Sequence, residues 1–252
     1  MDITGNTVLI TGGGSGIGLA LARAFHAQQN SVIIVGRDPQ KLAEARRQCP
    51  GLHVVQADIT KEDDRLRLVA DIRERFPALN ILVNNAGVAF ISDLATDPEA
   101  FDKFRLEAET NYLAPVRLTQ LLLGLLQRHA SAAVINITTI GAYLPVTIMP
   151  GYSASKAALS SFTRSLRLQL AATPVKVFEI LPPPVDTELV AVFHMDKLQP
   201  EQLAARVLQG LSKDREMIPI GIARLLLWMA RLAPRFFEGQ SHQQLLKATR
   251  SQ

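Results

Sequence analysis

Short apolar segments alternate with amphipathic segments along most of this chain, and this alternation restricts its fold more than any other feature. The apolar segments are rich in β-branched residues and apolar on both faces, which is typical of strands in a parallel sheet buried between helices. They predict six strands: TVLIT (7–11), SVIIV (31–35), LHVVQ (52–56), NILVNN (80–85), AAVINIT (132–138) and VKVFEIL (175–181).

The segments between these strands have the periodicity of about 3.6 residues that marks a helix with one buried face. They predict five helices: Ile17–Gln29, Pro39–Gln48, Lys61–Arg75, Pro98–Arg128 and Tyr152–Ala171. A strand followed by a helix, repeated five times, predicts an α/β doubly wound parallel sheet, the Rossmann fold. No low-complexity linker or internal repeat interrupts the chain, so we expect a single domain over residues 1–252.

The pattern changes beyond Pro182, where we expect a loop with a short helix and then a small C-terminal helical extension. A helix is predicted from Pro200 to Ser212, followed by the tail GIARLLLWMARLAPRFF. We expect the tail to form a helix that closes the sheet edge. Its arginines and aromatic residues leave a second interpretation open, a helix that lies on a membrane surface or on a partner.

The composition excludes several classes of protein. One cysteine, Cys49, allows no intrachain disulfide and gives no reason to expect an oxidising compartment. The net charge of +4 is spread along the chain without a dense basic run, so we expect no nucleic-acid partner. No uncharged apolar run approaches the roughly 20 residues of a membrane span. The N-terminus has no signal-peptide pattern, and the expected location is the cytoplasm.

A glycine-rich turn follows the first predicted strand directly, in the sequence GGGSGIGLALARAF. Where a buried strand runs through such a turn into a helix, free amides and the helix dipole favour a pyrophosphate. The strict G-x-G-x-x-G string is absent. The pattern is T-G-x-x-x-G-x-G, formed by Thr11, Gly12, Gly16 and Gly18. We therefore predict a dinucleotide site at this turn.

The end of the second predicted strand bears on which dinucleotide binds. An acidic residue there usually accepts a hydrogen bond from the ribose of NAD, whereas Gly36 and Arg37 leave room and a cation for the 2′-phosphate of NADP. NADP(H) is thus favoured over NAD(H). Asp38 follows at once and could bind a ribose, but we interpret it as the N-cap of the helix that opens at Pro39.

Tyr152 and Lys156 stand four residues apart with only small residues between them, so on a helix their side chains share one face. Taken alone they could form an ordinary surface pair. With the glycine turn, the run NNAG (84–87), Asn111 and YSASK (152–156), the sequence resembles the short-chain dehydrogenase/reductase family over residues 6 to about 190. The segments TVLITGG and PVKVFEILPPPVDTELV resemble its DltE-type branch, which is associated with teichoic-acid D-alanylation.

The resemblance implies the roles of individual cofactor-binding residues. These residues are Gly12, Ser15, Gly16, Ile17 and Gly18 at the pyrophosphate; Arg37 at the adenosine phosphate; Asp58 at the adenine; Asn85, Ala86 and Gly87 at the adenosine ribose; and Pro182, Val185 and Thr187 at the nicotinamide carboxamide. It also implies that residues 189–252 form a substrate lid and C-terminal helices.

The resemblance implies four catalytic residues. Tyr152 matches the proton donor, and Lys156 beside it would lower the phenol pKa and hold the nicotinamide ribose. Asn111 matches the asparagine that holds a proton-relay water. Thr139 stands where the family usually has serine, and it keeps the hydroxyl but adds a methyl group. A second departure is Pro183, which replaces the glycine of a Pro-Gly pair and removes an amide donor.

The expected function is NADP-dependent oxidoreduction of a small-molecule carbonyl or secondary alcohol, without a catalytic metal. An apolar substrate pocket is expected, from Phe90, Ile91, Leu144, Met149, Val190 and Phe193. Two alternatives stay open: a nucleotide-binding sensor with vestigial catalysis, and an accessory role in D-alanylation of cell-envelope polymers.

The resemblance also implies a homodimer or homotetramer, which would assemble through the helices Pro98–Arg128 and Tyr152–Ala171. Four leucines there, some of which must face the sheet instead, supply apolar surface: Leu118, Leu121, Leu122 and Leu125.

Overall fold

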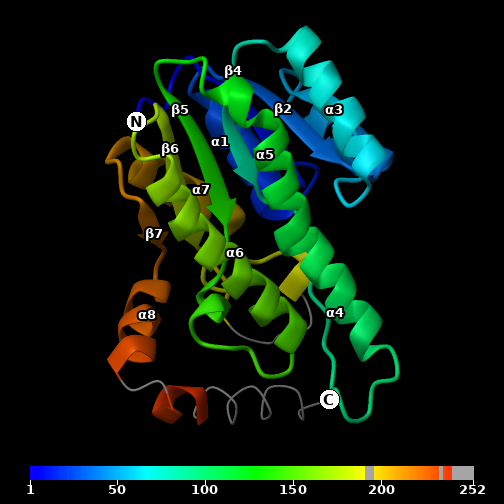
Figure 1. Cartoon of the computed structure of the whole chain (residues 1–252), viewed down its shortest axis with the longest axis vertical. Helices are drawn as coiled ribbons and strands as arrows, with labels where there is room; N and C mark the ends of the chain where they lie inside the picture. Colours follow the sequence, from blue (N-terminus) through cyan, green and yellow to red (C-terminus); the bar gives the residue numbers. More distant parts are fainter. Residues whose placement is uncertain (191–195, 233–234, 240–252) are drawn as a thin grey trace.

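A parallel β-sheet forms the centre of the molecule (Figure 1). The computed structural model describes residues 1–190, 196–232 and 235–239. Within these ranges seven strands lie in the order β3-β2-β1-β4-β5-β6-β7. Their bounds are β1 Thr7–Thr11, β2 Ser31–Gly36, β3 His53–Gln56, β4 Leu79–Asn84, β5 Ala132–Ile137, β6 Val175–Leu181 and β7 Met217–Pro219. The six predicted strands and the doubly wound parallel sheet are confirmed.

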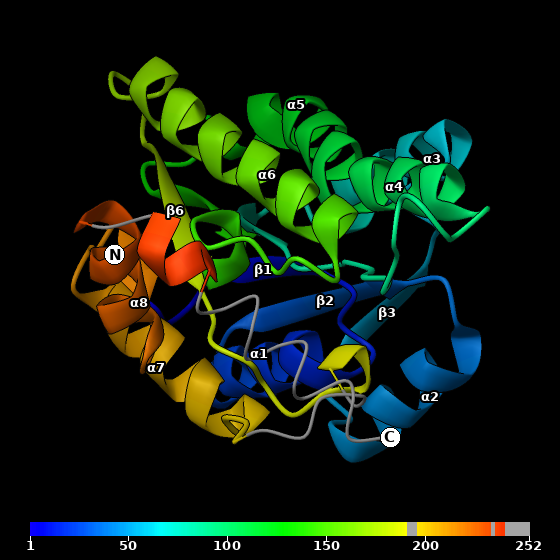
Figure 2. The same cartoon turned by 90° about the horizontal axis from the view of Figure 1, so that it is seen from below.

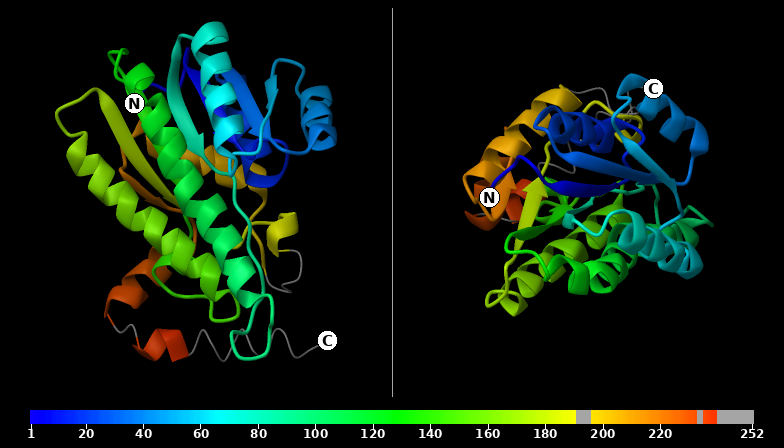
Figure 3. Two further views of the ribbon diagram at one scale, coloured as in Figure 1. Left: turned by 45° about the vertical axis from the view of Figure 1, so that its right-hand side comes forward. Right: turned by 90° about the horizontal axis from the view of Figure 1, so that it is seen from above.

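Helices cover both faces of this sheet (Figures 2 and 3). One face carries α1 (Gly16–Ala27), α2 (Pro39–Gln48) and α7 (Pro200–Ser212), whose apolar residues share a core with Val8 and Ile10. The opposite face carries α3 (Glu62–Arg75), α5 (Ala114–Leu126) and α6 (Pro150–Gln169), which pack on Leu9. Successive residues of β1 therefore serve opposite cores, as the alternation of side chains along a strand requires.

The segment predicted as one helix over Pro98–Arg128 is interrupted. It forms α4 (Ala100–Ala108), a π-helical turn (Glu109–Leu113) and then α5. Pro115 has no N–H and cannot donate to the carbonyl of Asn111, which favours a wider turn at this point. The turn places Asn111 in the interior, fully buried.

Three of the four leucines named for a subunit interface face the sheet, as we expected of some of them. Leu118, Leu122 and Leu125 belong to the core beneath α5, and Leu121 is partly buried against it. Leucines three and four positions apart lie on one face of a helix, and here that face is turned inward.

The chain beyond β6 closes the sheet edge. β7 pairs in parallel with Glu179–Leu181 of β6. The next helix, α8 (Ala223–Leu232), contacts β7 and buries Ala223 and Leu227, whereas its Leu225, Trp228 and Leu232 are exposed. No helix in the described part of the chain combines the length and the apolarity that a bilayer crossing requires.

Candidate functional site

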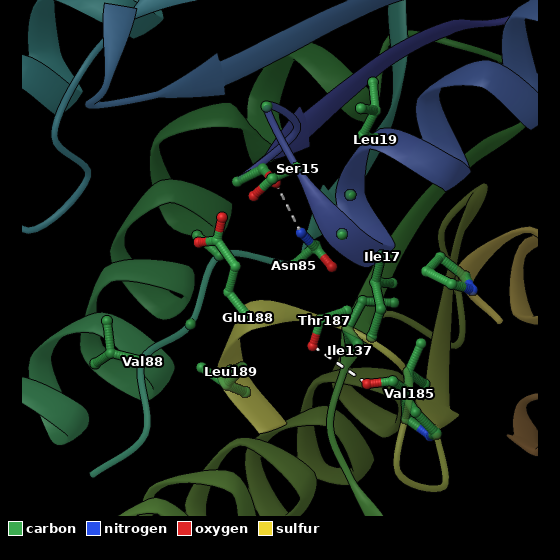
Figure 4. Close-up of a pocket in the computed structure, with 18 of the residues that line it drawn as sticks. Ser15, Ile17, Leu19, Asn85, Val88, Ile137, Val185, Thr187, Glu188 and Leu189 are labelled. Atoms are coloured by element: carbon green, nitrogen blue, oxygen red, sulfur yellow. Dashed lines mark hydrogen bonds between the residues drawn. The ribbon is translucent and has the colours of Figure 1, made fainter. Parts of the chain in front are cut away.

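A cavity of about 900 Å³ opens at the carboxyl ends of the strands, where the glycine turn meets the segment after β6. Figure 4 draws Ser15 and Ile17 of the turn and Thr187 and Leu189 of that segment around it. Every predicted cofactor-binding residue lines this cavity, together with Thr139. Asn111 does not line it and lies behind the wall.

Glycines give the turn its shape because other residues would be strained or would clash. Gly12 and Gly16 have φ angles of 65° and 52°, in the left-handed region that favours glycine. A Cβ on Gly18 would lie 2.2 Å from the carbonyl oxygen of Gly12. A Cβ on Gly16 would meet only Thr187, so this side of the turn faces the cavity. The first turn of α1 can thus approach an anion closely.

The NNAG run braces the glycine turn. The Thr11 hydroxyl accepts from the backbone N–H groups of Asn85, at 3.0 Å, and of Ala86, at 3.1 Å. The Asn85 side-chain amide donates back to the carbonyl oxygen of Thr11 at 2.9 Å. The side chain of Asn85 therefore holds the glycine turn in place through these hydrogen bonds.

The end of the cavity near β2 holds Arg37 and Asp58. Burial acts to raise the pKa of Asp58, but hydrogen bonds from Thr60 and the charge of Arg37 outweigh it and hold that pKa below its usual value. Asp38 caps α2, since its Oδ1 accepts from the backbone N–H groups of Gln40 at 2.8 Å and Lys41 at 3.1 Å. The N-cap interpretation of Asp38 is confirmed.

The opposite end of the cavity holds Tyr152 and Lys156, which lie one turn apart on α6. Lys156 is 4% exposed, its Nζ donates to the carbonyl oxygen of Ile137 at 2.8 Å, and burial lowers its pKa to about 8. Removal from water raises the pKa of Tyr152 to about 12; a hydrogen bond with Thr139 opposes this shift, and the charge of Glu107 adds to it. The lowering of this pKa that we expected from Lys156 is therefore not found, and Lys156 is not among the causes of the shift.

Asn111 connects three elements behind the cavity wall. Its Oδ1 accepts from the backbone N–H of Val88 at 2.9 Å, and its Nδ2 donates to the Val88 carbonyl at 2.8 Å and to the Ser155 hydroxyl at 3.0 Å. Ser155 is one of the small residues between Tyr152 and Lys156. Its small side chain thus lets α6 approach the π-helical turn.

The two departures from the pattern of the family that the sequence resembles both line the cavity. Thr139 begins a short 3-10 turn and its hydroxyl accepts from the N–H of Gly141 at 3.2 Å. The neighbouring Thr138 is buried with its hydroxyl near Glu179 and the carbonyl of Ile180, away from Tyr152. Pro183 lies in a loop whose next residue, Pro184, accepts from the N–H of Leu198 at 3.0 Å.

The expected apolar substrate residues divide into several groups. Met149 lines the cavity, whereas Phe90, Ile91 and Leu144 do not. Phe193 lies outside the described residues, as does the side chain of Val190. Lining residues that sequence reasoning missed include Lys41 and Glu188, which form an ion pair across the cavity mouth. That pair spans 147 positions, so no local pattern could reveal it.

Comparisons with known proteins agree with this geometry. A family model described as short chain dehydrogenase matches residues 6–197. The uncharacterized oxidoreductase DltE of Bacillus subtilis (strain 168) is 43% identical over 189 residues, 75% of this chain and 75% of that protein.

Solved structures of short-chain dehydrogenases have the same fold as this chain. A short chain dehydrogenase from Burkholderia cenocepacia J2315 in complex with NADP superposes with a TM-score of 0.85 at 26% identity, over 96% of this chain and 99% of that one. A short chain dehydrogenase/reductase from Burkholderia phymatum in complex with NAD shares the fold, with a TM-score of 0.84 at 20% identity over 95% and 96% of the two chains. The matches to the family model and to DltE together show that this chain belongs to the short-chain dehydrogenase/reductase family of oxidoreductases.

Proposed function

We propose that this protein is an NADPH-dependent oxidoreductase that interconverts a carbonyl group and a secondary alcohol in a small-molecule substrate. The observation that carries the proposal is the cavity itself, which extends from Arg37 and Asp58 at one end to Tyr152 and Lys156 at the other. A cavity of about 900 Å³ with a glycine cradle at its centre fits a dinucleotide and leaves space beside the Tyr–Lys pair.

The pyrophosphate would lie against residues 12–18, where glycines expose backbone amides to the cavity. Asp58 would accept from the adenine amino group, and Ala86 and Gly87 would flank the ribose. On the nicotinamide side Val185 and Thr187 would hold the carboxamide, and Pro182 would pack against the ring.

The preference for NADPH rests on Arg37. Its guanidinium is exposed beside Gly36 at the cavity edge, where it can grip a 2′-phosphate. Asp38, the acid at that strand end, also lines the cavity, but its Oδ1 is engaged in capping α2. The NADP complex of the Burkholderia cenocepacia relative supports this choice.

Side chains of the protein would carry out the proton transfer that accompanies hydride transfer. The nicotinamide, when bound, supplies or accepts the hydride. Tyr152 would donate a proton to the substrate oxygen, and Thr139, its hydrogen-bond partner, would fix that oxygen in place. The Lys156 ammonium, buried one turn away, favours the phenolate that donation leaves behind. A bound nicotinamide ribose would give Lys156 a further acceptor.

Asn111 would support a relay of protons to solvent. Its side chain is occupied by Val88 and Ser155, so a relay water would bind its main-chain carbonyl, which Pro115 leaves without the usual helical donor.

We also include self-association in the proposal. Leu113, at the end of the π-helical turn before α5, and Leu168 of α6 are exposed and would supply apolar surface to an interface. Light scattering would measure the oligomeric state.

A fluorescence titration with NADPH and with NADH tests the cofactor assignment. We expect NADPH to bind more tightly, and Arg37→Ala to weaken NADPH by about tenfold or more while NADH changes little, since the lost contact is a charge-assisted hydrogen bond. Arg47→Ala, on the exposed surface of α2 outside the cavity, is the matched control. Preference for NADH would overturn the assignment.

Tyr152→Phe then separates the enzyme from the alternatives. In a screen of carbonyl compounds we expect wild-type NADPH oxidation and almost none for the variant. Tight NADPH binding with no activity that depends on Tyr152 would instead support a nucleotide-binding sensor or an accessory role in cell-envelope polymer D-alanylation.

A further inference from the structure

A buried carboxyl group lies next to the Tyr–Lys pair and has no part in the reaction as proposed. Glu107, near the end of α4, is 0% exposed. Its Oε1 accepts from the backbone N–H of Phe90 at 2.8 Å, in the loop that follows β4. Its Oε2 is buried and has no hydrogen-bond partner among the described residues. An unpaired carboxylate in such a place is costly, so its presence calls for an explanation.

The unpaired oxygen lies against the first turn of α6. A Cβ on Gly151 would come within 2.1 Å of Oε2 and within 2.6 Å of the Phe104 ring. Only glycine at this position allows the carboxyl group to come so close. Because Gly151 directly precedes Tyr152, the carboxyl group lies beside the backbone of the tyrosine, and its charge acts on the phenol.

No basic side chain in the described structure neutralises this carboxyl group. Burial raises the pKa of Glu107, the Phe90 amide opposes the shift, and no cation contributes. The charged neighbours are engaged elsewhere. On the elements around Glu107, Lys103 pairs with Asp97, Arg105 with Asp102, and Glu109 with Arg65, while Lys156 of α6 donates to the Ile137 carbonyl. Among the titratable groups of the described residues, Tyr152 is the one whose pKa the charge of Glu107 raises.

We propose that Glu107 is a positioning residue whose protonation state controls how readily Tyr152 gives up its proton. An uncharged carboxyl group leaves the phenolate unopposed, whereas a carboxylate repels it. Through the Phe90 amide the same group ties the loop after β4 to the first turn of α6. The functional part of this inference rests on the proposed acid–base role of Tyr152.

The chain has three tyrosines, so their ionisation can be followed individually by NMR of protein labelled with ¹³C at the tyrosine Cζ. Tyr152→Phe identifies the signal of Tyr152. We expect Glu107→Gln, which keeps an acceptor for Phe90 but removes the charge, to lower the pH of Tyr152 ionisation by roughly one unit. The signals of Tyr112 and Tyr143 should titrate as in wild type.

Glu179→Gln is the matched control, because Glu179 is a second buried acid and lies 3.3 Å from the Tyr143 hydroxyl. It should shift Tyr143 and leave Tyr152 unchanged. Equal ionisation of Tyr152 in wild type and Glu107→Gln would overturn the inference. So would a common shift of all three tyrosines in Glu107→Gln, which would indicate general loosening of the fold.

The wild type offers a second measurement should Glu107→Gln fail to fold. Its Tyr152 signal should move in two steps, a small one when Glu107 ionises and a large one when the phenol does; a single step would refute the coupling. None of these titrations needs a substrate. A shifted titration together with full activity of Tyr152→Phe would refute the proposed function while leaving the electrostatic coupling intact.

Discussion

Replacing Gly18 by alanine should destabilise the protein, although alanine is the better helix former. Gly18 is the third residue of α1, where alanine alone would gain about 1 kcal/mol. Its Cβ, however, would lie 2.2 Å from the Gly12 carbonyl oxygen and 2.5 Å from Asn85 Nδ2. The carbonyl belongs to the backbone of the glycine turn, so the strain cannot be relieved by rotating a side chain. Overpacking of this kind costs about 3 kcal/mol, which leaves a net loss of about 2 kcal/mol.

Gly124→Ala provides the comparison within the same chain. Gly124 lies in α5, and a Cβ there would meet nothing within 4 Å, so this variant should gain up to about 1 kcal/mol. Urea denaturation of both variants, with unchanged slopes, should separate their free energies of unfolding by about 3 kcal/mol. NADPH affinity should fall only in Gly18→Ala. If Gly18→Ala proves as stable as Gly124→Ala, the glycine turn has room for a methyl group and the packing explanation is wrong.

Three further predictions concern charged side chains at the cavity. Lys156 has a pKa of about 8 in the folded state against an ordinary 10.5. Between these pH values the unfolded chain still binds the proton that the folded chain has lost, so the free energy of unfolding should rise with pH by up to about 3 kcal/mol. Denaturation of Lys156→Met should lack this rise. Asp38→Ala should cost about 1 kcal/mol of stability through loss of the cap, with the NADPH-to-NADH preference unchanged; a switched preference would instead assign Asp38 to the ribose. Glu188→Gln should free Lys41 at the cavity mouth and tighten NADPH several-fold relative to NADH, and equal affinities in wild type and variant would show that the ion pair does not compete with the cofactor.

The sheet and most of the cavity could be predicted because their signals are local. Apolar β-branched runs identify strands β1 to β6, and a Gly-rich turn between a buried strand and a helix predicts a place where a phosphate can bind. Asp38 before Pro39 is a local capping signal, and the structure confirms the cap. By contrast, β7 has three residues, too few for any periodicity.

The features that escaped prediction depend on tertiary contacts. Glu107 and Gly151 are 44 positions apart, and neither residue is unusual on its own helix. The leucines of α5 form one apolar stripe, but the stripe cannot indicate whether it faces a sheet or a second subunit. Pro115 is visible in the sequence, but proline is tolerated in the first turn of a helix, so it does not reveal the π-helical turn that precedes α5.

The π-helical turn at Glu109–Leu113 has a consequence for how this segment can change in evolution. A π-helical turn holds one residue more than an α-helical turn, so the helix after it is rotated by about 100° relative to an unbroken helix. That rotation lets α4 direct Glu107 toward α6 while α5 directs Leu118 and Leu122 into the sheet. Deleting one residue here would return the two helices to a common phase and turn one of these faces away from its partner. Substitutions in Glu109–Leu113 should therefore be tolerated more readily than insertions or deletions, which would change the length of the segment.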